Sequence, residues 1–228
     1  MAKGEPRVAC SGALILILGL LAAEAGKEGL ASFYVQSGRQ VVGVWMDSRR
    51  LPRQDEWMAA MAHVSDALRF APDGAWPLEE MGGLQLQRVR IAADPPIGEA
   101  AARAARVFFR RALRERPTSP FAWANLALAK LYLGEADSEL VDALAHSREL
   151  GPWEPEVQQT VAFVGLAVWH QLGADGRAMI AQTMERLVLK DPGRAVEIGA
   201  AFNRPDLICG TQTAAPLAGQ ICSRAHGQ

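Results

Sequence analysis

The side chains that could carry chemistry are few and stand apart from one another. His63 and Asp66 lie three positions apart in a stretch with helical periodicity, so both would face one side of a helix as metal ligands or as an acid–base pair. No third partner accompanies them in the sequence, and His146 and His170 are equally isolated. We therefore expect these groups to be structural, and we predict no catalytic residues, no metal site and no cofactor.

The sequence also lacks the motifs of the common reaction classes. It contains no GxSxG nucleophile motif, no P-loop, no HExxH zinc motif and no glycine-rich strand-to-helix turn. Glu79 and Glu80 form a carboxylate pair, but they lie near an expected helix start, where negative charge is favourable. The chain is therefore predicted not to be an enzyme. The competing interpretation is a secreted or periplasmic enzyme, which would need a polar pocket around His63 or the acidic groups.

One expected helix carries an arginine stripe on the face opposite its apolar residues. The stripe consists of Arg103, Arg106, Arg110 and Arg114. Guanidinium groups in this arrangement would suit an anionic partner, such as an acidic glycan, lipid headgroups or an acidic protein patch. A solvated outer helix face is the other interpretation.

The cysteines bear on the compartment in which the protein works. Cys209 and Cys222 flank a segment containing Gly, Thr, Ala and Pro, which suits a disulfide bond formed in an oxidising compartment. In the loop-entropy description such a bond contributes about 3 kcal/mol. Two unrelated thiols are the alternative, and zinc has less support because no CxxC or paired histidines accompany them. Cys10 is expected to be a membrane-buried thiol.

The first residues have the order of a signal or signal-anchor sequence. Lys3 and Arg7 precede an uncharged run over residues 8–23. A helix of roughly 16 residues spans about 24 Å, somewhat short of the ~30 Å hydrocarbon layer, although bilayer thinning could close the gap. Ala23-Glu24-Ala25 fits a cleavage site, so release is the alternative to an anchor. In both cases the bulk of the chain is expected beyond the membrane, away from the basic residues.

Composition limits the fold and the partners. The chain has 228 residues, of which half are apolar, enough for one domain or a short solenoid besides an anchor. Lys and Arg number 24 against 25 Asp and Glu, so the weak overall field argues against nucleic-acid binding. Ala, Leu, Arg and Glu recur with few β-branched residues, which favours an all-α fold.

An internal repeat with uneven spacing organises the chain. A small residue, in one case loosely replaced by leucine, precedes a proline by five positions, and the proline ends a helix. The four pairs are Ala67 with Pro72, Ala112 with Pro117, Ser147 with Pro152 and Leu187 with Pro192. The predicted helices cover residues 54–71, 78–91, 97–115, 120–132, 137–150, 154–172 and 176–189, with a shorter capping helix at 194–201.

These patterns resemble the tetratricopeptide family, whose units are antiparallel helix pairs. The best match runs through Ala105, Phe109, Ala112 and Pro117, then Trp123 and Leu126 of the next unit. Ala127 replaces the usual Gly, and Lys130 stands where Tyr is expected. The repeats are also spaced by 45, 35 and 40 residues rather than by a regular 34, so the helices or loops must vary in length.

The resemblance implies a groove for a partner helix. In tetratricopeptide proteins the first helix of each unit lines the concave face. By matching position, the groove residues here are Phe121, Ala124, Leu128, Leu131 and Tyr132. Because this surface is apolar, we expect it to receive a helix from a partner or from the chain itself. The chain's own candidate is the segment containing Leu30, Tyr34, Val41 and Trp45.

A closer resemblance comes from two proline-rich junctions, at residues 116–123 and 150–158. Arg-Pro-Thr-Ser-Pro-Phe-Ala-Trp, followed by Leu-Gly-Pro-Trp-Glu-Pro-Glu-Val-Gln, is similar to the VpsP-type proteins of bacterial exopolysaccharide clusters. In that family an inner-membrane anchor carries a tetratricopeptide-like domain without a catalytic motif. The resemblance implies a role in polysaccharide biosynthesis or export.

Together these patterns predict a tethered helical scaffold. The expected parts are a signal anchor at 1–28, a juxtamembrane helix at 29–52, a tetratricopeptide-like domain at 53–202 and a C-terminal tail at 203–228. The expected location is the bacterial inner membrane, with a single pass and the bulk of the chain in the periplasm. Its partners would be proteins of an envelope polysaccharide machine, without nucleic acid or a small-molecule substrate. An assembly factor for another envelope system is the alternative with the same fold.

Overall fold

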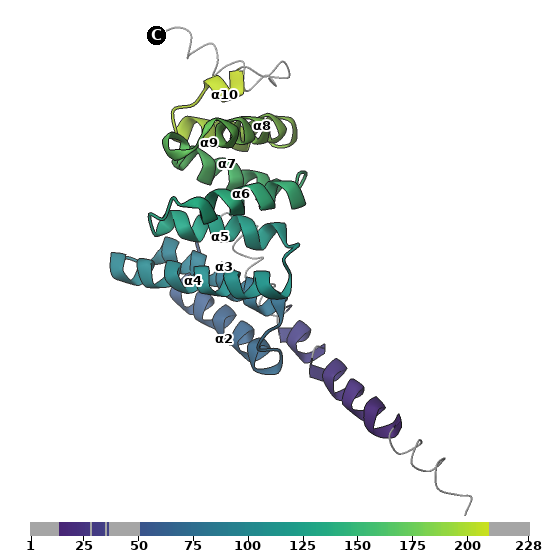
Figure 1. Ribbon diagram of the computed structural model, residues 1–228. Helices are drawn as coiled ribbons and strands as arrows, with labels where there is room; N and C mark the ends of the chain where they lie inside the picture. The colour runs from purple at the N-terminus through teal and green to yellow at the C-terminus, as the bar shows by residue number, and fades with distance from the viewer. Residues whose placement is uncertain (1–13, 28, 35, 37–50, 210–228) are drawn as a thin grey trace, which may run out of the picture.

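The protein is all-helical wherever its structure is described. The computed structural model describes residues 14–27, 29–34, 36 and 51–209, and this part contains no β-strand (Figure 1). After the N-terminal helical residues, the elements are α2 (Gln54–Phe70), α3 (Ala75–Ile91), α4 (Pro95–Glu115), α5 (Pro120–Tyr132), α6 (Ser138–Leu150), α7 (Pro155–Ala167), the 3₁₀ turn η1 (Trp169–Gln171), α8 (Ala174–Lys190), α9 (Pro192–Ala201) and α10 (Asp206–Cys209).

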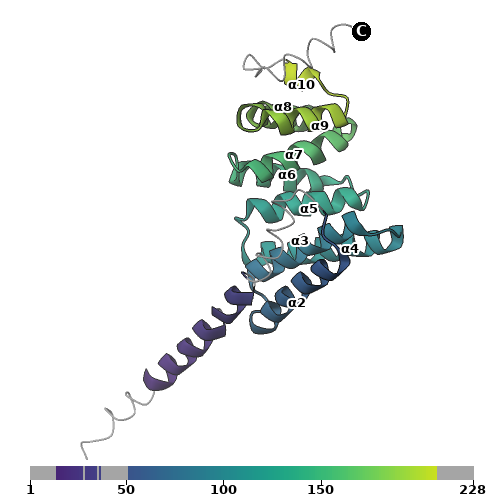
Figure 2. The same cartoon turned by 180° about the vertical axis from the view of Figure 1, so that it is seen from behind.

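The helices stack in chain order. Figures 1 and 2 show successive layers from α2 to α10, with the purple N-terminal helix projecting away from the α2 end. Each helix from α2 to α9 packs on the next, and α3 also contacts α5, α5 contacts α7, and α7 contacts α9. The odd-numbered helices α3, α5, α7 and α9 therefore contact one another in series along the stack.

Four helices end with the same backbone geometry. Their C-cap residues have φ between −127° and −144° and ψ between 55° and 80°, and each precedes a proline. In each case the cap N–H donates to the carbonyl oxygen four residues earlier, at 2.7–3.0 Å. The accepting residues, Ala67, Ala112, Ser147 and Leu187, are the four that the sequence repeat singled out, and all are fully buried. The sequence repeat therefore corresponds to a repeated type of helix end. At each, a buried residue accepts the last hydrogen bond of the helix, and the proline that follows prevents the helix from continuing.

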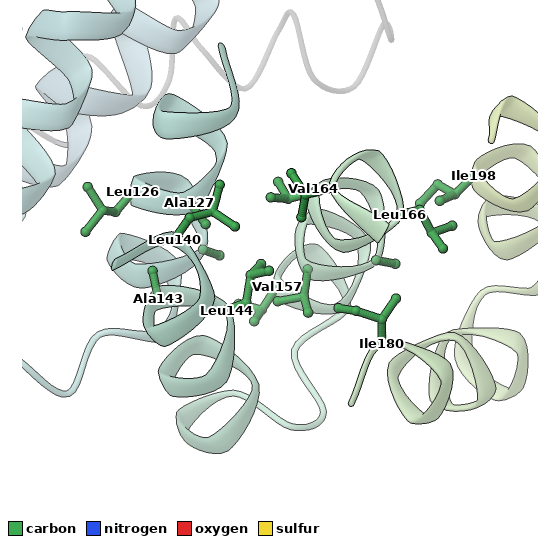
Figure 3. Packing of buried hydrophobic residues seen from close by; sticks show 14 of the residues in the cluster. Leu126, Ala127, Leu140, Ala143, Leu144, Val157, Val164, Leu166, Ile180 and Ile198 are labelled. Atoms are coloured by element: carbon green, nitrogen blue, oxygen red, sulfur yellow. The ribbon is translucent and has the colours of Figure 1, made fainter. Parts of the chain in front are cut away.

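Close helix approach explains the small residues. Gly82 of α3 lies against Phe109 of α4, and a Cβ added at Gly82 would come within 2.7 Å of the phenyl ring. Phe109 is buried to 1% exposure as a result. Phe109 belongs to the main core, which runs from α3 to α10, and Figure 3 shows side chains of this core meeting between successive helices. Members labelled there include Leu126, Leu140, Leu144, Val157, Val164, Ile180 and Ile198.

One helix ends earlier than predicted. The helix predicted at 154–172 ends at Ala167, because Val168 leaves the helical region (φ −102°, ψ 15°) and η1 follows. Packing continues after α9. Ile208 of α10 is 1% exposed and lies against Gly199 of α9, so the body includes residues up to Cys209.

The N-terminal helical residues expose an apolar surface. Residues 14–27 are helical, and the large aliphatic side chains at 14–18, 20 and 21 are 53–69% exposed. Farther along the chain, Tyr34 stacks on Phe70 of α2, with the ring centroids 5.7 Å apart. Within the described residues, no helix has both the length and the apolar character needed to cross a membrane. Residues 1–13 and 28 of the predicted anchor lie outside this part.

Candidate functional site

The arginine stripe meets acidic residues that are remote in sequence. Arg106 forms an ion pair with Glu135, and Arg110 binds Glu139 through two nitrogens, with its Nε 2.8 Å from Oε1. These carboxylates lie in the loop after α5 and in the first turn of α6. Two of the four arginines are therefore paired between elements. In the same stripe Arg103 pairs with Glu99 one turn away, whereas exposed Arg114 forms no ion pair with a described residue.

Lys130 lies at the centre of this cluster. Its side chain is only 1% exposed, although it belongs to α5 among alanines and leucines. Lys130 Nζ donates to Glu135 at 3.1 Å, to Asp137 at 2.9 Å and to Glu139 at 2.6 Å. The three donors of the ammonium group are thus satisfied by three carboxylates, as a buried lysine requires.

The pKa shifts in this cluster favour the charged form of the groups concerned. Hydrogen bonding to Arg110, with Lys130 in addition, lowers the pKa of Glu139 to about 2. Arg106 lowers the pKa of Glu135, and Lys130 lowers that of Asp137. Burial pulls the pKa of Lys130 down, but the hydrogen bonds that its ammonium group donates to the three carboxylates outweigh this effect, and the net pKa is raised. We name this group, Arg106, Arg110, Lys130, Glu135, Asp137 and Glu139, the α4–α6 ion cluster.

The ion cluster was not found from the sequence, although two signals were present. Lys130 departs from the tyrosine expected at its position, and acids recur at 135, 137 and 139. Neither signal shows that α4, α5 and the start of α6 converge. The cluster connects these three elements and pairs each cation with a carboxylate, although the buried Arg106 Nε has no hydrogen-bond partner. Its arrangement is that of a structural clamp.

The predicted groove residues divide between the core and the surface. Ala124 is 2% exposed, while Phe121, Leu128 and Leu131 are half-buried against the main core. Tyr132 alone among the five is exposed, at 37%. It borders a depression shared with the α3–α4 junction, lined also by Val89, Ala92, Asp94, Pro95 and Glu99. Helix binding at this surface stays a prediction.

The chain's own candidate for the groove lies partly elsewhere. Tyr34 packs with Phe70 at the end of α2, and Leu30 is 46% exposed. Val41 and Trp45 lie outside the described residues. The described part of this segment contacts α2 through Tyr34 and Phe70.

The histidines make contacts of a structural kind. Asp66 pairs with Arg69 at 3.5 Å, and half-buried His63 has no ion pair with a described residue. His146 stacks on Trp123 at 4.6 Å, with Nδ1 2.8 Å from the Asp142 carbonyl oxygen. Among the described residues, no group of three His, Cys, Asp or Glu side chains is arranged to hold a metal ion.

Cys209 takes part in a disulfide bond. Its predicted partner, Cys222, lies outside the described residues, so this pairing stays a prediction. Comparisons with known proteins add no identification, because no protein-family model and no curated protein matches the chain.

Proposed function

We propose that this chain is a membrane-tethered, non-catalytic scaffold with a tetratricopeptide-like body. The observation that carries the proposal is the apolar helix at 14–27, whose aliphatic side chains are mostly exposed although it is joined to a well-packed body. Burying seven such side chains in lipid would be favourable by roughly 1.5–3 kcal/mol each. Residues 8–13, which precede this helix in the sequence, are also uncharged.

The tetratricopeptide-like assignment rests on two features. Four helix ends share one geometry, and alternate helices contact each other along the stack. The units of the proposed repeat are α3 with α4, α5 with α6 and α7 with α8, preceded by α2 and capped by α9. Such stacks present extended surfaces for docking.

The body is proposed to lie outside the cytoplasm, in the periplasm. Lys3 and Arg7 precede the apolar run, and basic residues stay on the cytoplasmic side. The disulfide at Cys209 supports the same side, because cytosolic thiols are kept reduced.

The proposed role is to position components of an exopolysaccharide synthesis or export machine. This part rests on the two proline-rich junctions, at 116–123 and 150–158, and on their resemblance to exopolysaccharide-cluster proteins. Exposed Tyr132, beside the α3–α4 depression, is the surface at which a partner helix is proposed to dock.

Cross-linked pull-down from native membranes tests this function. Glycosyltransferase, polymerase or polysaccharide-export subunits should be captured by the tagged chain, and Tyr132→Ala should reduce their recovery. Leu189→Ala, a change at an exposed side chain of α8, is the matched control and should have no effect. Capture of pilus or cytochrome-maturation subunits instead would assign the scaffold to another envelope system, and undiminished capture by Tyr132→Ala would remove the docking surface.

A further inference from the structure

A basic surface on α6 and α8 surrounds the exposed ring of Trp153. This residue lies in the turn between α6 and α7 and is 61% exposed. The guanidinium carbon of Arg186 lies 5.4 Å from the ring centroid, and Lys190 Nζ lies 5.8 Å from it. Both cations come from α8. They hold the indole at the surface through cation–π contact, and do not bury it.

Beside Trp153 lies a shallow pocket that contains a second arginine. Its lining residues are Ala145, Arg148, Glu149, Pro152, Met179 and Arg186. One terminal nitrogen of Arg148 donates to Gln182, but its buried Nε has no hydrogen-bond partner. A buried donor without a partner costs free energy, but Arg106 Nε and Arg116 Nε are in the same state, so the case for a ligand rests on the unpaired charges and on Trp153.

The charges at this pocket are not balanced within the described chain. Arg148, Arg186 and Lys190 form no ion pair with any described residue, and Glu149 is the single acid among the lining residues. Burial, and then the neighbouring Arg186, lower the pKa of Arg148. Residues 210–228 contain no aspartate or glutamate, so that segment has no acidic side chain to offer. An anion at this surface would balance these charges.

We propose that this surface binds a carboxylated sugar, such as a uronate unit of an acidic polysaccharide. Arg148 and Arg186 would take the carboxylate, since guanidinium forks match its geometry. The exposed indole of Trp153 would pack on the C–H face of the pyranose ring, a flat apolar surface that an acidic peptide side chain does not have. This inference rests on the proposed function and names the class of glycan that the scaffold contacts.

Titration of the full chain in nanodiscs with defined saccharides tests the proposal. The chain carries 5-fluorotryptophan, and the Trp153 signal is assigned by its loss in Trp153→Phe. Trigalacturonate should shift this ¹⁹F signal, whereas maltotriose, a neutral trisaccharide, should not. Arg148→Gln and Arg186→Gln should each raise the Kd by about tenfold or more, equivalent to about 1.4 kcal/mol. Added salt should weaken binding.

Control variants and competing anions distinguish sugar binding from a loss of stability and from general anion binding. Arg69→Gln removes an exposed arginine from α2 and should leave the Kd unchanged. If Arg148→Gln lowers the melting temperature, Arg148→Lys, which keeps the charge but not the fork, carries the test and should also weaken binding. Absence of a Trp153 shift, or equal binding by triglutamate or inorganic phosphate, would overturn the proposal. Because partner capture is measured separately, its success alongside a failed titration would reject only the sugar site.

Discussion

At the scale of single residues, Lys130 is the most constrained charge in the described chain. Its ammonium group reaches three carboxylates from an almost fully buried side chain. The carboxylates are partly exposed, and two of them also bind arginines of α4. The lysine is thus held by a local concentration of acids that would repel one another without it.

Removing this ammonium group should destabilise the fold. In Lys130→Met the side-chain volume is kept, but three carboxylates lose a shared cation. We expect the free energy of unfolding to fall by about 2 kcal/mol, less than for a fully buried ion pair because the carboxylates retain water. Urea denaturation measures the change, with Arg114→Met as the surface control. A loss below about 0.5 kcal/mol would show that water and the arginines satisfy the acids.

The same cluster predicts acid sensitivity. The pKa of Glu139 is lowered to about 2 in the folded chain, so its ionisation stabilises the fold above its ordinary pKa, near 4.5. This contribution is lost as the pH falls from about 4.5 through about 2. Glu139→Gln should cost about 1 kcal/mol at pH 7, allowing for solvent screening of a carboxylate that is one-third exposed. The difference from wild type should shrink toward pH 2, and a constant difference would contradict it.

At the scale of elements, neighbouring helices are fitted by residue size. Gly82 leaves room for the Phe109 ring, whereas a Cβ at Gly83, the next residue of α3, would meet nothing within 4 Å. Two adjacent glycines of one helix therefore differ only in what faces them.

This pair gives a matched substitution test. Gly83→Ala should raise the free energy of unfolding by about 0.5–1 kcal/mol, because alanine favours helix over glycine. Gly82→Ala gains the same propensity but must displace a buried phenyl ring, and overpacking costs about 1–3 kcal/mol. We therefore expect a net loss. Thermal denaturation followed by circular dichroism compares the two, and stabilisation by both changes would show that α3 and α4 can separate easily.

At the scale of the whole molecule, the apolar N-terminal helix projects from a stack that buries its own core (Figure 1). Leu16 and Ile17 of this helix are 69% and 53% exposed within the described part of the chain. Such exposed aliphatic side chains would be more favourably placed in an apolar environment than in water.

Charging this helix should release the protein from membranes. Leu16→Asp combined with Ile17→Asp should move most of the chain to the soluble fraction after a carbonate wash, because charge within the bilayer core is strongly unfavourable. Fractionation with immunodetection measures the shift. Leu189→Asp, at an exposed position of the body, is the control. A wild-type chain already removed by carbonate would contradict the tether.

The sequence alone determined the helical fold and the ends of its repeats, because those signals are local. A proline following a buried residue such as Ala112 stops a helix whatever packs on it, and the predicted bounds of residues 120–132 match α5. Only the tertiary structure decided that Arg106 meets Glu135, 29 positions away. It likewise showed that Leu128 is partly buried against the main core. Such pairings depend on how α4, α5 and α6 are placed against one another, and helical periodicity defines a face but not its neighbour.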